Sequence, residues 1–123
     1  MPEVMIYHNP SCSKSRGALE ILQQNFAPDA IREIHYLQES MTLETLQRLC
    51  ELLNKSPVNL IRKGEPKMAE LNLGNTDAFS DQEWLMVLVE NPILIERPIV
   101  VYRDKAVIAR PPELVLTLLM NTD

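Results

Sequence analysis

Residues 4–16 read VMIYHNPSCSKSR, an apolar run followed by a polar turn and the start of a helical pattern. The run Val4-Met5-Ile6-Tyr7 predicts a buried strand, and the helical pattern begins at Ser15. Cys12 therefore lies at a strand-to-helix turn, where free amides and the helix dipole favour a negative charge. A thiol in that position can ionise near neutral pH, and the same amides can hold a small anion beside it. The alternative is a small buried apolar side chain, because cysteine is often buried.

Composition describes an ordinary globular protein. The 123 residues are 46% hydrophobic and 24% charged, which is enough for one domain with its own core. The net charge of −5 argues against general binding to nucleic acid or to an anionic membrane, but leaves room for a local basic pocket. Two cysteines, Cys12 and Cys50, are too few for a disulfide framework or a zinc site. With no secretion signal and no apolar stretch that could span a membrane, we expect a cytoplasmic location, where thiols stay reduced.

Periodicity and turn residues predict the order of the elements. Strands are expected at residues 3–8, 31–37, 99–102 and 106–109, and helices at 15–25, 42–54, 57–62, 66–71, 80–90 and 112–120. This order predicts an α/β fold, a thioredoxin-like mixed sheet with a helical insertion between the second strand and a C-terminal β-hairpin plus helix. The insertion covers about residues 42–90, and residues 1–123 are expected to form a single domain because both ends share one sheet.

Three arginines lie beside helix-breaking residues at expected loop edges, namely Arg62, Arg97 and Arg110. Each alone is explained as a solvated side chain. Together they could clamp a tetrahedral oxyanion, because guanidinium matches oxyanion geometry with paired hydrogen bonds. Their spacing does not establish that they converge, and it leaves open whether the Arg97-Pro98 bond is cis or trans.

The residues around Cys12 argue against two other thiol chemistries. A dithiol oxidoreductase needs a second cysteine three positions on, where this chain has Ser15. A phosphatase-like loop would carry an arginine at the position of Ala18. His8 could tune the thiol or donate to a substrate, or it could simply end its strand as a polar residue.

Two further residues receive no site role. Cys50 falls in line with Leu43, Leu46 and Leu53 on one helical face, which predicts a core residue. His35 lies on the polar second strand, and its neighbours suggest no function.

Four segments of the chain resemble the glutaredoxin-dependent arsenate reductase (ArsC) family, in the family's order and over nearly the full length. They are Ile6-Tyr7-His8-Asn9-Pro10-Ser11-Cys12 with Ser15-Arg16, Leu60-Ile61-Arg62-Lys63, Asn91-Pro92-Ile93-Leu94-Ile95-Glu96-Arg97-Pro98-Ile99-Val100, and Arg110-Pro111-Pro112-Glu113. The resemblance implies a thioredoxin-like sheet, Cys12 as the nucleophile, and the three arginines as oxyanion ligands. It also implies that His8 and Ser15 assist formation of the thiolate.

The resemblance further implies an oxidoreductase of arsenic detoxification that converts arsenate to arsenite. A covalent thiol-arsenate adduct on Cys12, the redox-active cysteine, would be resolved by glutathione as co-substrate and by glutaredoxin. No bound cofactor and no metal are expected, and the partners are arsenate or a similar oxyanion, glutathione and glutaredoxin. We expect a monomer that binds neither nucleic acid nor a membrane.

Two alternative functions remain open. The first is a redox-type regulatory binding protein of the same fold that contacts RNA polymerase; such relatives usually carry a cysteine pair near the N-terminus, whereas this chain has Cys12 alone there. The second is a glutathione-dependent thiol transferase, suggested by the Cys12-to-Ser15 spacing of monothiol glutaredoxins. A thiol transferase has no need of three arginines, so the arginines favour arsenate reduction.

Overall fold

The computed structural model describes residues 3–39, 41–74 and 78–120. The chain forms two compact units: a sheet unit made of Met1–Glu39 and Arg97–Asp123, and a helical unit made of Ser40–Glu96. The helical unit corresponds to the segment expected to be an insertion. That the whole chain folds as one domain stays a prediction.

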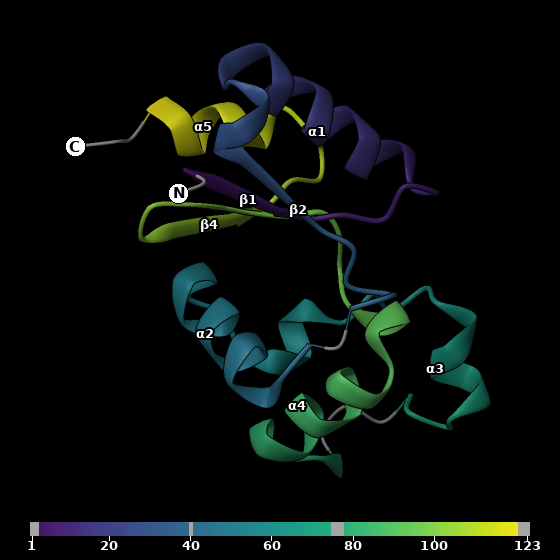
Figure 1. Cartoon of the computed structure of the whole chain (residues 1–123). Coiled ribbons are helices and arrows are strands. Elements are labelled where there is room, and N and C mark those ends of the chain that lie inside the picture. Colours follow the sequence, from purple (N-terminus) through teal and green to yellow (C-terminus); the bar gives the residue numbers. More distant parts are fainter. Residues whose placement is uncertain (1–2, 40, 75–77, 121–123) are drawn as a thin grey trace. The chain divides into compact units, whose positions relative to one another are not determined.

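The sheet unit carries a mixed four-stranded sheet. Its elements are β1 (Val4–Tyr7), α1 (Ser13–Asn25), β2 (Ile31–Ile34), β3 (Ile99–Tyr102), β4 (Lys105–Ile108) and α5 (Leu114–Met120). The strand order is β2-β1-β3-β4, with β1 parallel to β2 and antiparallel to β3, and β4 antiparallel to β3 (Figure 1). This is the thioredoxin-like sheet of the α/β class that the order of elements predicts.

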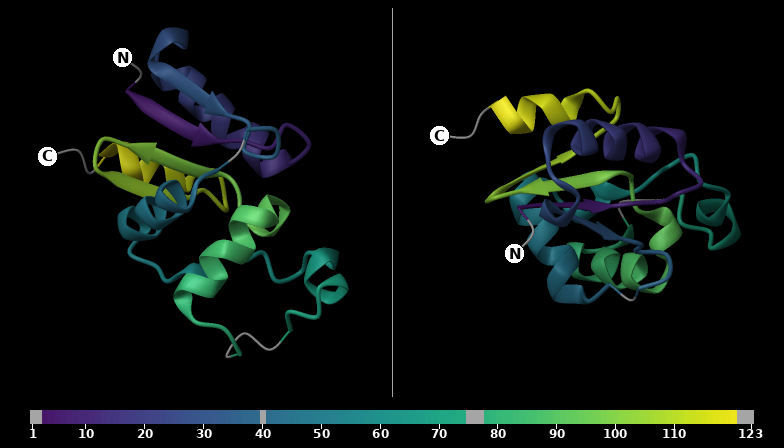
Figure 2. Two further views of the ribbon diagram at one scale, coloured as in Figure 1. Left: turned by 60° about the horizontal axis from the view of Figure 1, so that its bottom comes forward. Right: turned by 45° about the horizontal axis from the view of Figure 1, so that its top comes forward.

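Helices α1 and α5 lie on one face of this sheet (Figures 1 and 2). Alternate side chains of a strand point to the same face, so every second strand residue packs beneath the two helices. The resulting core consists of Val4, Ile6, Ala18, Leu22, Val100, Tyr102, Ala109, Val115 and Leu118. The apolar run of the first strand is therefore buried as the sequence predicts.

Gly17 permits a close approach between α1 and the turn that precedes α5. A Cβ atom at this position would lie 3.1 Å from Cγ of Pro112, which is closer than most carbon contacts. The absence of a side chain lets the turn pack directly on α1. Pro112 is thereby held against α1.

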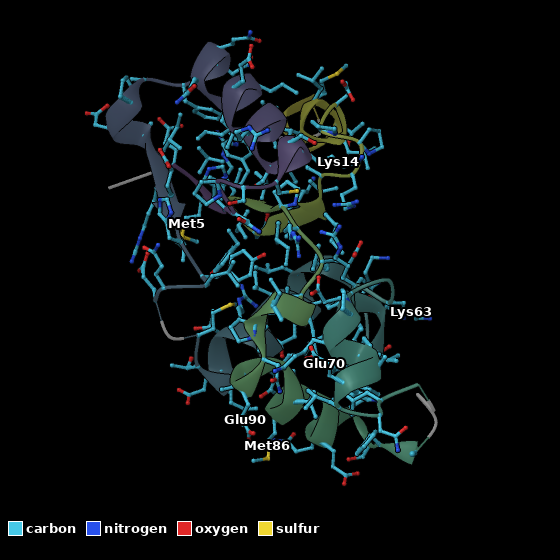
Figure 3. All side chains as sticks on the ribbon, turned by 90° about the vertical axis from the view of Figure 1, so that its right-hand side faces the viewer. Met5, Lys14, Lys63, Glu70, Met86 and Glu90 are labelled. Carbon is cyan, nitrogen blue, oxygen red and sulfur yellow. The ribbon has the colours of Figure 1, made fainter. Side chains whose placement is uncertain are left out.

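The helical unit is built from short helices joined by tight turns. They are α2 (Leu43–Leu53), a 3₁₀ helix (Pro57–Leu60), α3 (Pro66–Glu70), α4 (Asp81–Glu90) and a second 3₁₀ helix (Pro92–Leu94). The largest side chains buried here include Leu46, Leu49, Trp84 and Leu88, whereas Met86 lies on the outer side of α4 (Figure 3). Among the described residues, no helix has both the length and the apolar character needed to cross a bilayer.

Both predicted helix caps of this unit are present. The side chain of Thr42 accepts a hydrogen bond of 3.0 Å from the Thr45 amide at the start of α2. At the start of α4, the Glu83 amide donates to Ser80 Oγ and the Ser80 amide donates to Glu83 Oε1, which completes the capping box. Side chains thus satisfy amides that a helix start leaves without partners.

The second strand is shorter than its sequence pattern predicts. It ends at Ile34, because the His35 amide donates to Glu39 Oε2 at 3.0 Å and the His35 carbonyl accepts from the amides of Gln38 and Glu39. The backbone therefore turns at His35 instead of continuing to Leu37.

The other boundary differences are small and local. The first helix begins at Ser13 and the last at Leu114, two residues from the expected starts in each case, and residues 57–62 form a shorter 3₁₀ helix. In the hairpin, Tyr102 pairs with Lys105, so the turn holds only Arg103 and Asp104. Arg103 adopts a positive φ of 59°, which suits a two-residue turn.

The capping box of α4 gives a direct test of the helical unit. Ser80→Ala should lower the free energy of unfolding by about 1 kcal/mol, since it leaves the Glu83 amide without its acceptor. Urea unfolding measures the change. Ser56→Ala is the matched control, because Ser56 precedes a 3₁₀ helix without forming a side-chain cap. An equal loss in both variants would contradict a specific role for the box.

Candidate active site

Cys12 is the N-cap residue of α1, immediately before the first helical residue. It is half-buried, with extended backbone angles of φ −99° and ψ 122°. Its amide donates to the Asn9 carbonyl at 2.9 Å, and its carbonyl accepts the first helical bond from the Arg16 amide at 3.0 Å. The thiol thus lies at the strand-to-helix turn, as the sequence predicts.

Side chains on both sides of Cys12 hold this turn in place. Asn9 Oδ1 accepts from the Ser11 amide at 3.0 Å, and the Asn9 amide donates to Ser15 Oγ at 3.0 Å. Arg16 Nη1 donates to the Pro10 carbonyl at 2.8 Å. No role was expected for Asn9; the Asn-Pro pair, which is typical of turns, was the available signal for it.

The surroundings of Cys12 favour its charged form. Burial raises the pKa of the thiol, but the amides of Ser15 and Lys14 together with the Arg97 side chain bring the pKa below its ordinary value. Among the influences that lower this pKa, the hydrogen bond from the Ser15 amide is the largest, followed by the hydrogen bond from the Arg97 side chain. A lowered pKa increases the thiolate fraction, and thiolate is the nucleophile.

Arg97 lies at this cysteine, and Arg110 lies beside Arg97. The buried Arg97 side chain interacts with the Cys12 sulfur, and Arg110 Nη1 donates to the Arg97 carbonyl at 3.0 Å. The Arg97-Pro98 bond, left open by the sequence, is cis, and so is Arg110-Pro111. The sheet unit therefore brings one of the three candidate arginines to the thiol and a second to the backbone of the first.

Arg62 belongs to the helical unit. Its amide donates to the Leu94 carbonyl at 2.7 Å, beside the bridge between Ile61 and Ile95. Its Nη1 is buried and has no hydrogen-bond partner among the described residues. Because Arg62 and Cys12 lie in different units, their convergence stays a prediction.

His8 and Ser15 form a buried pair next to the turn. His8 Nδ1 and Ser15 Oγ are 2.7 Å apart. Burial lowers the pKa of His8, Glu33 opposes this effect, and His35 and Arg16 reinforce it. His8 therefore gives up its proton more readily than an ordinary histidine, and it reaches the Cys12 turn through Ser15.

Cys50 differs from Cys12 in its surroundings. It is buried in α2, which confirms the expected core position, although it also borders a surface cavity of about 440 Å³. Burial raises the pKa of Cys50, and Asp81 and Glu51 raise it further. In the part of the chain that the structure describes, no cluster of histidine, cysteine and acidic residues is arranged to hold a metal ion.

The topology of the sheet is that of the thioredoxin-like class, and a cysteine with a lowered pKa lies at the start of α1. The ArsC family model matches residues 7–118, and the chain belongs to this family. It is 43% identical to an arsenate reductase of Haemophilus influenzae over 94% of this chain and 98% of that protein. It is 41% identical to the uncharacterized protein YfgD of Escherichia coli K12, over 94% of this chain and 96% of the relative. The structure of an arsenate reductase from Vibrio cholerae superposes with a TM-score of 0.84 at 44% identity, covering 93% of this chain and 95% of that one.

The two thiols should differ in reactivity with pH. In a Cys50→Ser background, we expect the rate at which iodoacetamide alkylates Cys12 to rise with pH. The midpoint should lie below the pKa of a peptide cysteine, which is about 8.5. The sign follows from the lowered pKa of Cys12. In a Cys12→Ser background, native Cys50 should react slowly until well above that pH. Equal profiles for the two thiols would contradict the site described here.

Proposed function

We propose that this protein is an arsenate reductase, which converts arsenate to arsenite through a covalent adduct on Cys12. The observation that carries the proposal is the interaction of the Arg97 side chain with a thiol whose pKa is lowered. A cation at the nucleophile suits an anionic substrate, and the related protein of Haemophilus influenzae is named an arsenate reductase.

In this proposal the arginines bind the oxyanion. Arg97 and Arg110 would neutralise arsenate beside Cys12, each presenting paired N–H donors to its oxygens. Arg62 would add a third guanidinium, and its buried Nη1 without a partner is consistent with a group reserved for a ligand. The negative net charge of the chain does not prevent anion binding, because the site needs only local positive charge.

The chemical step is a displacement at arsenic. The Cys12 thiolate attacks the arsenic atom, a sulfur–arsenic bond forms, and an arsenate oxygen leaves as water after protonation. Ser15 and His8 would assist by holding the turn and the thiolate. No metal and no bound cofactor take part in this scheme.

Reduction from arsenic(V) to arsenic(III) needs two electrons, which two thiols supply by forming one disulfide. Cys50 is buried, with a raised pKa, and is a poor second thiol. Glutathione would therefore add to the arsenic of the adduct as co-substrate, displacing a second oxygen as water. The glutaredoxin thiolate would then attack the glutathione sulfur: a disulfide forms, the bond from that sulfur to arsenic breaks, and its electron pair stays on arsenic. Water would finally release arsenite from Cys12. This dependence on reduced thiols supports a cytoplasmic location. We propose a monomer that serves arsenic detoxification.

A reconstituted assay tests the reaction. Arsenate-dependent NADPH consumption with glutathione, glutaredoxin and glutathione reductase should require each component, because each supplies or recycles a thiol. Cys12→Ser should reduce turnover to the level without enzyme, whereas Cys50→Ser should keep most activity. Turnover by Cys12→Ser would reveal another nucleophile. Activity on a protein mixed disulfide without activity on arsenate would instead support a thiol transferase.

Replacing the arginines tests the oxyanion clamp. We expect Arg97→Ala and Arg62→Ala each to lower kcat/KM for arsenate by about 100-fold, since each removes a charged donor from the transition state. Arg48→Ala is the matched control, because Arg48 is exposed on α2 and pairs only at 3.5 Å with Glu51. Unchanged turnover in Arg97→Ala would eliminate the clamp, and unchanged turnover in Arg62→Ala alone would remove Arg62 from it.

A further inference from the structure

Two histidines meet at the ends of neighbouring strands, beside the reactive turn. β1 and β2 pair in parallel with Ile6 opposite Glu33 and Tyr7 opposite Ile34, and the His8 amide donates to the Ile34 carbonyl at 2.9 Å. Continuing this register brings His35 next to His8. Their rings pack edge to face, with centroids 5.7 Å apart and planes at 82°.

Hydrogen bonds fix the backbone of His35 next to His8. Its backbone is fixed by the Glu39 carboxylate and by two amides of the following turn. Its Nε2 lies 3.5 Å from Glu33 Oε1, on the same face of β2. The half-buried His35 ring therefore stands between solvent and His8, with a carboxylate at one nitrogen.

The partner of His8 on its other side is Ser15, which has only one hydroxyl proton to donate. One lone pair of Ser15 Oγ already accepts from the Asn9 amide. If His8 Nδ1 lacks a proton, the hydroxyl must donate to it; if Nδ1 carries a proton, Nδ1 donates and the hydroxyl proton is released for another acceptor. Ser15 is also a residue whose amide faces the Cys12 sulfur, so His8 is hydrogen-bonded to a residue that contacts the thiol.

We propose that His35 and Glu33 are positioning residues for Cys12: together they set the charge of His8, and His8 directs the single hydroxyl proton of Ser15. The inference rests on the proposed function only in taking Cys12 as the reactive thiol. It assigns a purpose to two side chains that neither bind substrate nor build the core.

The charges around His8 fix the direction of each effect. Glu33 favours protonated His8, while His35 and Arg16 disfavour it, and Glu33 has the largest effect of the three. Arg32, the other charged residue of β2, acts instead on Tyr7. Protonation of His8 places Nδ1–H on Ser15 and adds positive charge next to a residue that contacts Cys12, and positive charge near a thiolate lowers the pKa of the thiol.

The two variants should therefore have opposite effects, which a merely structural role would not produce. His35→Leu removes the ring that disfavours protonated His8 and keeps the Glu33 carboxylate that favours it. The midpoint of the Cys12 alkylation profile should therefore move to lower pH. Glu33→Gln, which is nearly isosteric and lies on an exposed strand position, should move the profile to higher pH. Below the midpoint of the profile, the alkylation rate is proportional to the thiolate fraction. A shift of the midpoint by half a pH unit therefore changes the rate at a fixed pH about threefold.

The experiment uses the full chain carrying Cys50→Ser, with iodoacetamide as probe and no arsenate present. Two-dimensional NMR of the imidazole nitrogens follows the titration of His8 in the same samples. Gln38→Ala is the matched control on the same turn, and the double variant of His35 and Glu33 should fall between the two single variants. Shifts in the same direction, or none larger than in the control, would overturn the proposal. Because thiol ionisation is read directly, this result is independent of whether arsenate is the substrate.

Discussion

The start of α1 is the constraint on which the rest of the site depends, because the first amides of a helix need acceptors. Asn9 takes the amides of Ser11 and Cys12 through its side chain and its carbonyl. The amides of Lys14 and Ser15 face the Cys12 sulfur. An ionised sulfur satisfies them better than a neutral thiol, so the lowered pKa is also a contribution to stability. That contribution is present above the ordinary thiol pKa and is lost as pH falls through the folded value.

The same residue type has opposite chemistry in the two units. Cys50 is buried in α2 with acidic neighbours, whereas Cys12 faces amides and a guanidinium. Desolvation raises the pKa at both positions, so burial alone does not separate them. The sign of the nearby charge decides which thiol ionises. Of the two cysteines, Cys12 is therefore the one whose surroundings favour a nucleophilic thiolate.

Local signals in the sequence were sufficient for most elements. An apolar run gave β1, and Ser80 and Thr42 marked helix starts through their hydroxyls, which are interactions within four residues. The end of β2 was missed, although the interaction that ends it is also local. The Glu39 carboxylate captures the His35 amide and turns the chain, although the residues from Ile31 onward are acceptable in a strand. The packing of His35 on His8 then depends on the pairing of two separate strands, which is why no function for His35 was visible in the sequence.

The arginines show how strongly a site depends on register. Prolines beside Arg97 and Arg110 marked them as loop residues, but not as neighbours. The hairpin brings them together: Ile99 pairs with Ile108, the Ala109 amide donates to the Pro98 carbonyl, and Arg110 then reaches the Arg97 carbonyl. A three-residue turn at 103–105, as the sequence suggested, would move β4 by one residue. That slip would turn its side chains to the opposite face and place Pro111, which has no side-chain donor, opposite Arg97. The two-residue turn at Arg103 and Asp104 is therefore part of what places Arg110 beside Arg97.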